Sequence, residues 1–176
     1  MALLIYLKSG TPIVIAHRRV GFGGRTYKCL KFRTMVVDAD KVLERYIASN
    51  PAVARELQET CKLRNDPRIL PIGRLLRKTS LDELPQLVNV LRGEMSCVGP
   101  RPVEPRDIVK FGHRDRNYMR ALPGLTGLWQ VNGRSTTTLR RRIAFDTLYV
   151  RNWSIWLDIK ILLMTIPAVL RTGETS

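Results

Sequence analysis

Two adjacent carboxylates, Asp82 and Glu83, have the residue types and spacing best suited to chemistry in this sequence. The surrounding pattern predicts a helix with Asp82 as its N-cap and Pro85 as its third residue, where proline is tolerated. Exposed N–H groups and the positive end of the helix dipole attract phosphate there. One carboxylate can then attack phosphorus to form an acyl phosphate, while the other helps to hold Mg²⁺. The simpler interpretation is an acidic helix cap.

Three cations are candidate phosphate ligands. Arg77 lies five residues before Asp82. Arg101 stands between two prolines, whose rigid rings can hold its guanidinium fork for bidentate binding of phosphate, although a solvated loop arginine is the alternative. Lys31 closes a predicted strand, and here the alternative is an ordinary polar strand face.

A further group of polar residues follows the glycine-rich turn at 122–127. The run Trp129-Gln-Val-Asn-Gly-Arg134 combines an aromatic ring, two amides and an arginine. These groups suit a nucleobase edge and a diphosphate, so Gln130 and Arg134 are candidate nucleotide ligands. The sequence contains no G-x-x-x-x-G-K-[ST] loop and none of the common nucleic-acid signatures.

The charge balance points to an anionic partner. The 176 residues include 30 Lys and Arg against 15 Asp and Glu, a formal net charge of +15. This excess is typical of proteins that meet nucleic acid, phosphorylated substrates or acidic lipid headgroups. The three cysteines have no C-x-x-C spacing and no histidine at ligand spacing, which excludes a disulfide framework and a zinc site. They indicate a reduced, cytosol-facing compartment.

The elements that position these residues form a mainly helical α+β single domain over residues 1–176, with one small hairpin. Residues 12–16 and 26–32 are the predicted strands of the hairpin, and the glycines at 21–24 supply its turn. Helical patterns follow at 38–61 (interrupted by Pro51), 69–78, 84–91 and 138–151.

The helix at 84–91 has the clearest apolar pattern. Its apolar residues repeat at i, i+3, i+4 and i+7, namely Leu84, Leu87, Val88 and Leu91. This repeat predicts one buried stripe, and Gly93 is the expected stop signal.

Both ends of the chain contain apolar residues. Residues 2–7 are too few to span a bilayer, which takes about 20 residues, and they lack the features of a signal peptide. Residues 153–170 are longer, but a spanning helix would bury Asp158 and Lys160 in hydrocarbon at high cost. The segment is therefore either an interfacial helix on a membrane or a hydrophobic core helix.

Five motifs in order resemble those of the bacterial sugar transferase family, the monotopic phosphoglycosyl transferases. They are Lys31-Phe-Arg-Thr-Met35, Arg77-Lys-Thr-Ser-Leu-Asp-Glu-Leu-Pro-Gln-Leu87, Val98-Gly-Pro-Arg-Pro102, Pro123-Gly-Leu-Thr-Gly-Leu-Trp-Gln-Val-Asn-Gly-Arg134 and Asp158-Ile-Lys-Ile-Leu162. The resemblance covers residues 10–170. The Leu-Trp-Gln sequence and the insert at 40–65 look most like members that transfer galactose or glucose phosphate to undecaprenyl phosphate in exopolysaccharide synthesis.

The resemblance implies that a UDP-sugar and a polyprenyl phosphate give a polyprenyl-diphosphate-sugar and UMP. It implies a two-step, Mg²⁺-dependent course in which Asp82 takes the phosphosugar and both Asp82 and Glu83 contact the metal. The remaining implied roles are phosphate binding by Arg77, Arg101 and Lys31, nucleotide binding by Arg134 and Gln130, and support of the site by Asp158.

The resemblance also implies a place in the cell and a set of partners. The expected location is the cytoplasmic face of the bacterial inner membrane, with anionic lipids as partners, a possible homodimer and no nucleic acid. Family members carry a re-entrant membrane helix before residue 12, of which only residues 2–7 remain here, so a truncated anchor is expected. The alternatives are an inactive binder of nucleotide sugars and a non-enzymatic basic module for anionic lipid or nucleic acid. The basic module explains the charge of +15 but not a carboxylate pair among arginines.

Overall fold

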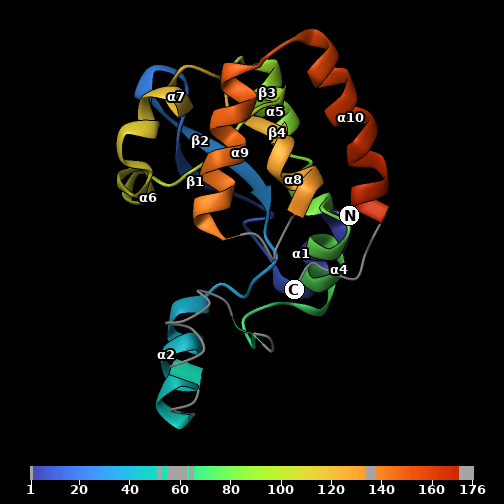
Figure 1. Ribbon diagram of the computed structural model, residues 1–176. Helices are drawn as coiled ribbons and strands as arrows, with labels where there is room; N and C mark the ends of the chain where they lie inside the picture. The colour runs from blue at the N-terminus through green and yellow to red at the C-terminus, as the bar shows by residue number, and fades with distance from the viewer. Residues whose placement is uncertain (1, 51–52, 55–62, 64–65, 134–137, 171–176) are drawn as a thin grey trace.

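The computed structural model describes residues 2–50, 53–54, 63, 66–133 and 138–170 (Figure 1). In chain order its elements are α1 (Ala2–Ser9), β1 (Val14–Val20), η1 (Phe22–Gly24), β2 (Thr26–Phe32), α2 (Ala39–Ser49), α4 (Pro71–Lys78), η2 (Leu81–Glu83), α5 (Gln86–Leu91), β3 (Ser96–Val98), α6 (Pro105–Ile108), η3 (Val109–Arg114), α7 (Asp115–Met119), β4 (Gly124–Thr126), α8 (Leu128–Gly133), α9 (Leu139–Arg151) and α10 (Ile155–Leu170). Helices dominate and the sheets are small, which confirms the mainly helical α+β prediction.

The first sheet is the predicted hairpin. Strands β1 and β2 pair antiparallel, from Val14 opposite Phe32 to Val20 opposite Thr26. The first strand therefore extends beyond the predicted end at residue 16. Gly23 and Gly24 both have positive φ angles, 64° and 78°, which explains why glycines occupy this turn.

The second sheet is a short parallel pair that the sequence did not indicate. Strand β3 pairs with β4, with Ser96 opposite Gly124 and Val98 opposite Thr126. The backbones approach so closely that a Cβ on Gly124 would lie 2.1 Å from the backbone nitrogen of Gly99. This contact places the loop that carries Arg101 directly beside the glycine-rich turn.

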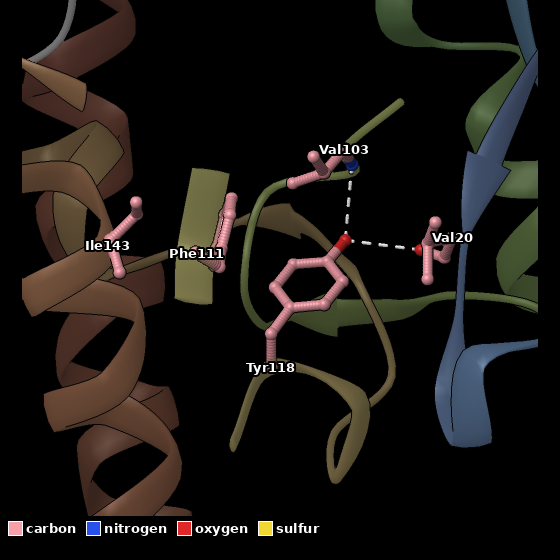
Figure 2. Close-up of a cluster of buried hydrophobic side chains, with 5 residues drawn as sticks. All are labelled: Val20, Val103, Phe111, Tyr118 and Ile143. Atoms are coloured by element: carbon pink, nitrogen blue, oxygen red, sulfur yellow. Dashed lines mark hydrogen bonds between the residues drawn. The ribbon is translucent and has the colours of Figure 1, made fainter. Parts of the chain in front are cut away.

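A buried cluster joins the hairpin to the segment after Arg101 (Figure 2). Its members are Val20, Val103, Phe111, Tyr118 and Ile143. The Tyr118 hydroxyl accepts a hydrogen bond of 3.1 Å from the Val103 N–H and lies 3.2 Å from the carbonyl oxygen of Val20. The end of β1 and the segment that leads into α6 are thus fixed to one phenol group.

Helix α5 differs from its prediction in both its start and its orientation. It begins at Gln86, after a 3₁₀ turn over Leu81–Glu83, so Asp82 is not an α-helix N-cap. The expected buried stripe is wrong: Leu84, Leu87, Val88 and Leu91 are between 40% and 87% exposed. The residues that α5 buries are Gln86 and Asn89.

Asn89 explains why α5 turns its polar side inward. Its fully buried amide donates to the carbonyl oxygen of Lys28 (2.9 Å) and accepts from the N–H of Leu30 (3.0 Å). The same Nδ2 donates to Glu94 at 2.6 Å. The Asn89 side chain therefore satisfies the outer edge of β2 as a neighbouring strand would.

The remaining predicted helices are confirmed where the structure describes them. Helix α2 covers the first part of the 38–61 pattern and projects from the rest of the molecule, whereas the break at Pro51 lies outside the described residues (Figure 1). Helix α9 matches the pattern at 138–151. Helix α10 follows the 153–170 segment along one side of the molecule. None of the helices described has the length and hydropathy needed to cross a membrane.

Asn89→Leu should lower the free energy of unfolding by about 3 kcal/mol, because two backbone groups of β2 lose their buried partner. Urea unfolding followed by tryptophan fluorescence measures this loss. Leu91→Ala is the control on the same helix, since Leu91 is 87% exposed, and it should change the value by less than about 0.5 kcal/mol. Equal losses in the two variants would contradict the role given to Asn89.

Candidate active site

Glu83 is the point at which three distant segments meet. Its Oε1 lies 2.7 Å from Nζ of Lys31, at the end of β2, and 3.3 Å from Nη2 of Arg101. Two of the predicted phosphate ligands therefore converge on the predicted carboxylate pair. Both cations use the same oxygen, so neither of these two ion pairs involves the second carboxylate oxygen, Oε2.

The pKa values of the two carboxylates are shifted in opposite directions. Burial acts to raise the pKa of Glu83, but Arg101 and Lys31 outweigh it and hold that pKa below its usual value. Burial raises the pKa of Asp82, and the neighbouring charge of Glu83 adds to this effect against Lys31, Arg77 and Arg101. Glu83 is thus an ionised group held by cations, whereas Asp82 is a carboxylate of increased basicity.

Asp82 is buried, and no described residue holds its carboxylate. Within the described part of the chain, no hydrogen bond or ion pair of the Asp82 carboxylate occurs, although Lys31 and Arg77 lie close enough to affect its pKa. A carboxylate that is near cations but not locked to one keeps its lone pairs for an incoming electrophile. This is the arrangement that a nucleophile at phosphorus needs.

Arg77 reaches the site from the last turn of α4. Its Nε donates to Oγ1 of Thr34 at 2.9 Å. Burial lowers the pKa of Arg77, and the charge of Asp82 opposes that shift. Helix α4 can come this close because residue 73 is glycine: a Cβ there would lie 2.1 Å from the carbonyl oxygen of Thr34.

The two cations of the first motif have different roles. Arg33 is buried, and its Nη2 donates to the carbonyl oxygen of Gly10 at 2.7 Å and to Oγ of Ser9 at 2.9 Å. It joins the end of α1 to the end of β2, whereas Lys31 faces Glu83. Thr34 in the same motif holds Arg77, a role that sequence reasoning missed.

A second group of residues lies behind Arg101. The guanidinium carbon of Arg101 lies 5.7 Å from the ring centre of Trp129, and that of Arg142 lies 5.2 Å from the same centre. Arg142 also donates to the carbonyl oxygen of Arg101 at 3.4 Å. Arg142 was not predicted from the sequence, where it is one of three consecutive arginines and nothing distinguishes it.

Asp146 completes this second group. It is buried one turn after Arg142 on α9, with 3.9 Å between its Oδ2 and Nε of Arg142. Burial raises the pKa of Asp146 to about 7, against the charge of Arg142 and hydrogen bonding from the Arg101 backbone. The sequence carried a signal for Asp146: it is the only acidic residue in the basic stretch 139–151.

A cavity of about 260 Å³ lies next to these residues. Its charged and polar lining includes Arg19, Lys31, Glu83, Gln86, Arg101 and Arg142. With Lys110, the lining has five cations against three carboxylates, Glu83, Glu104 and Asp107. This excess of positive charge suits an anionic ligand such as a diphosphate. Asp82 precedes Glu83 in the sequence but is not one of the residues that line this cavity.

Asp158, predicted to support the site, has hydrogen-bond partners on α9 and in the segment that follows it. Asp158 accepts from the Tyr149 hydroxyl at 2.8 Å and from Nε1 of Trp153 at 3.1 Å. The same Tyr149 hydroxyl lies 3.2 Å from the carbonyl oxygen of Val98, so Asp158 orients a group beside the strand that leads to Arg101. Arg134 lies outside the described residues.

Gln130 is on α8, next to Trp129. Both polar atoms of its amide are buried and have no hydrogen-bond partner among the residues described, and the same is true of Nε1 of Trp129. Unpaired buried polar atoms are costly in a folded protein. The nucleotide role predicted for Gln130 stays a prediction.

The donor set suits a metal that is shared with a substrate. No cluster of three or more His, Cys, Asp or Glu side chains with metal-binding geometry occurs among the described residues. Mg²⁺ is commonly bound through one or two carboxylates together with substrate phosphates. Asp82 and Oε2 of Glu83 fit that requirement, because neither is occupied by the two cations that hold Oε1.

Asp146→Asn should change how stability depends on pH. The folded protein keeps the Asp146 proton up to about pH 7, whereas the unfolded chain loses it near 3.8. This group therefore lowers the free energy of unfolding progressively as pH rises between those values. The melting temperature of the variant should rise relative to that of the wild type by about 10 °C across this pH interval, and above it the difference should stay constant. Thermal unfolding of both proteins at pH 4 to 8.5 measures the difference between their melting temperatures. A difference that does not vary with pH would contradict the prediction.

Comparison with known proteins matches the chain along nearly its whole length. The sequence profile described as Bacterial sugar transferase covers residues 1–172. The chain is 51% identical to Exopolysaccharide production protein ExoY of Sinorhizobium fredii, over 94% of this chain and 74% of that protein. It is 47% identical to Undecaprenyl-phosphate galactose phosphotransferase of Salmonella typhimurium, over 96% of this chain and 37% of that protein. UDP-glucose:undecaprenyl-phosphate glucose-1-phosphate transferase of Caulobacter vibrioides is 41% identical, over 98% of this chain and 62% of that protein.

Proposed function

The chain belongs to the bacterial sugar transferase family, as its motifs indicated, and from this premise we propose that it transfers a sugar 1-phosphate from a UDP-sugar to undecaprenyl phosphate, releasing UMP. The names of two relatives support this reaction, one with galactose and one with glucose as the sugar. The name of a third supports a place in exopolysaccharide synthesis. UDP-galactose and UDP-glucose are accordingly the proposed donors.

The contrast between Asp82 and Glu83 is the observation that carries the proposed mechanism. An oxygen of Asp82 attacks the β-phosphorus of the UDP-sugar, and the bond between that phosphorus and the bridging oxygen breaks. UMP leaves with the bonding electrons, and the phosphosugar stays on Asp82 as an acyl phosphate. An oxygen of undecaprenyl phosphate then attacks the same phosphorus and releases the Asp82 carboxylate.

The cations around the pair have separate tasks in this scheme. Lys31 and Arg101 keep Glu83 ionised and face the cavity, where they can balance the charge of the donor phosphates. Arg77 can bind phosphate oxygens at Asp82. Mg²⁺ held by Asp82 and Glu83 would neutralise phosphate oxygens as charge develops on them.

The exposed apolar side chains of α10 support attachment to a membrane surface. They include Ile155, Trp156, Ile159, Leu162, Leu163 and Ile166. Over residues 155–169 of this helix, Ile161 alone is fully buried, so the alternative of a core helix explains little of its composition. Lasting attachment takes apolar insertion together with attraction to anionic lipid, which the net charge of +15 can supply. We place this surface on the cytoplasmic side of the inner membrane.

Asp82→Asn should abolish a burst of UMP that needs no lipid acceptor. In a two-step course each site releases one UMP from the UDP-sugar alone, and an amide cannot attack phosphorus at neutral pH. Turnover should fall more than about 1000-fold. Quenched-flow assay of UMP, with mass spectrometry of the peptide carrying Asp82, measures both steps. Asp38→Asn, at an exposed carboxylate that is the N-cap of α2 and pairs with Lys41, is the matched control and should retain the burst.

The outcome of this experiment separates two mechanisms. An active preparation that gains no phosphosugar mass on that peptide would show direct attack by the lipid phosphate instead. Glu83→Gln should also lose most turnover, because Lys31 and Arg101 would face an uncharged group. Arg101→Lys should be damaging too, since a point charge cannot replace a bidentate fork.

Trp156→Asp should weaken binding to anionic vesicles. The side chain is 76% exposed on α10, and a carboxylate at a lipid interface is both poorly solvated and repelled by anionic headgroups. Sedimentation with vesicles of phosphatidylglycerol and phosphatidylcholine should show at least about a fivefold loss of affinity. Phe22→Asp is the control, because Phe22 is also exposed but lies in η1, the hairpin turn that contacts α7. Helix α7 lies on the opposite side of the molecule from α10 (Figure 1). Equal losses for both variants would contradict a membrane surface on α10.

A further inference from the structure

Helix α5 presents an apolar face to its surroundings while its polar side is buried. We refer to Leu84, Leu87, Val88 and Leu91 as the leucine face. A helix on the surface of a globular protein normally has the opposite arrangement. An exposed row of four aliphatic side chains therefore needs an apolar partner.

The leucine face cannot be hidden by rotation of the helix. Asn89 holds α5 to the outer edge of β2 through the backbone of Lys28 and Leu30. Gln86 faces the cavity that Lys31 and Arg101 also line. Any rotation that buried the leucines would break these contacts, so the exposure is built into the fold.

The position of the leucine face relates it to the site. Leu84 follows the carboxylate pair directly. Its N–H donates to the carbonyl oxygen of Leu81 at 3.3 Å, and its own carbonyl oxygen accepts from the N–H of Leu87 on α5 at 3.0 Å. The 3₁₀ turn of Asp82 and α5 therefore form one continuous piece. From Leu84 to Leu91 the row runs roughly 10 Å away from the pair, at about 1.5 Å per residue.

A ligand that contacts both the cations at the carboxylate pair and the leucine face must be anionic at one end and apolar along its length. Lys31 and Arg101 meet at the start of this piece, and four aliphatic side chains lie along the rest. A nucleotide sugar is polar throughout and leaves the leucine face unused. A polyprenyl phosphate has both properties in one molecule.

We propose that the leucine face of α5 binds the isoprenoid segment next to the phosphate of the acceptor, and so selects acceptors by chain length. This inference rests on the proposed function. It assigns the leucine face to the acceptor chain and not to bulk bilayer lipid, whose attachment site is the separate surface on α10.

The double variant Leu87→Gln and Leu91→Gln tests the assignment in detergent micelles, where attachment to a bilayer has no part. Both side chains are exposed, so the variant should fold, as its melting temperature would show. The ratio of kcat/KM for undecaprenyl phosphate to kcat/KM for the short, soluble acceptor isopentenyl phosphate should fall about tenfold. The change should appear mainly in KM for the long acceptor. Val109→Gln, a replacement of an exposed valine on η3, is the control and should keep the wild-type ratio.

The acceptor-independent burst of UMP separates the possible outcomes. A wild-type burst with an unchanged chain-length ratio in the double variant would overturn this inference and leave the proposed function intact. The same conclusion would follow if the wild type did not prefer the longer acceptor, or if both acceptors lost kcat/KM equally. A wild-type enzyme that released no UMP from UDP-galactose or UDP-glucose, with or without acceptor, would overturn the proposed function and this inference together.

Discussion

The ion pair between Lys31 and Glu83 is the interaction on which the candidate site depends. It joins the end of β2 to the turn that carries the carboxylates, and Arg101 reinforces it on the same oxygen. Because Glu83 takes these cations, Asp82 stays without a partner in the described structure although cations surround it. Neighbouring residues of similar chemistry thus acquire different tasks from their contacts alone. The arrangement requires β2, η2 and the Arg101 loop to be fixed together, as Asn89, Tyr118 and the contact at Gly99 ensure.

Much of the fold could be predicted from the sequence because its signals are local. Glycines mark the hairpin turn, periodicity marks α2 and α9, and a long apolar run marks α10. Helix α5 shows what such local signals do not determine. Its apolar repeat is real, but a repeat gives no information on whether the stripe meets a protein core or another apolar partner. The buried side of α5 was decided by Asn89, whose partners on β2 lie about sixty positions earlier in the chain. The start of the helix was missed because Ser80 adopts a left-handed φ of 57°, which favours a separate 3₁₀ turn.

The site was predicted in part, for a related reason. Motif resemblance identified Lys31, Glu83 and Arg101, which the structure brings into contact. It did not identify Arg142 or Asp146, because their importance comes from packing against the Arg101 loop across 41 and more positions. Side chains on different elements meet only through tertiary structure, so pattern and spacing along the chain cannot report them.

The wide spacing of the site also orders events during synthesis of the chain. Lys31 and Glu83 are separated by 52 positions, and Arg101 and Arg142 by 41. Domains tend to fold as units, from the N-terminal end as they emerge from the ribosome, and each long loop must close against its entropy before its contact forms. The carboxylates are therefore made well before α9 can support Arg101. A nascent chain carries the reactive pair without its complete set of cations, and the full electrostatic environment of Asp82 arises only when the last third of the domain has been added.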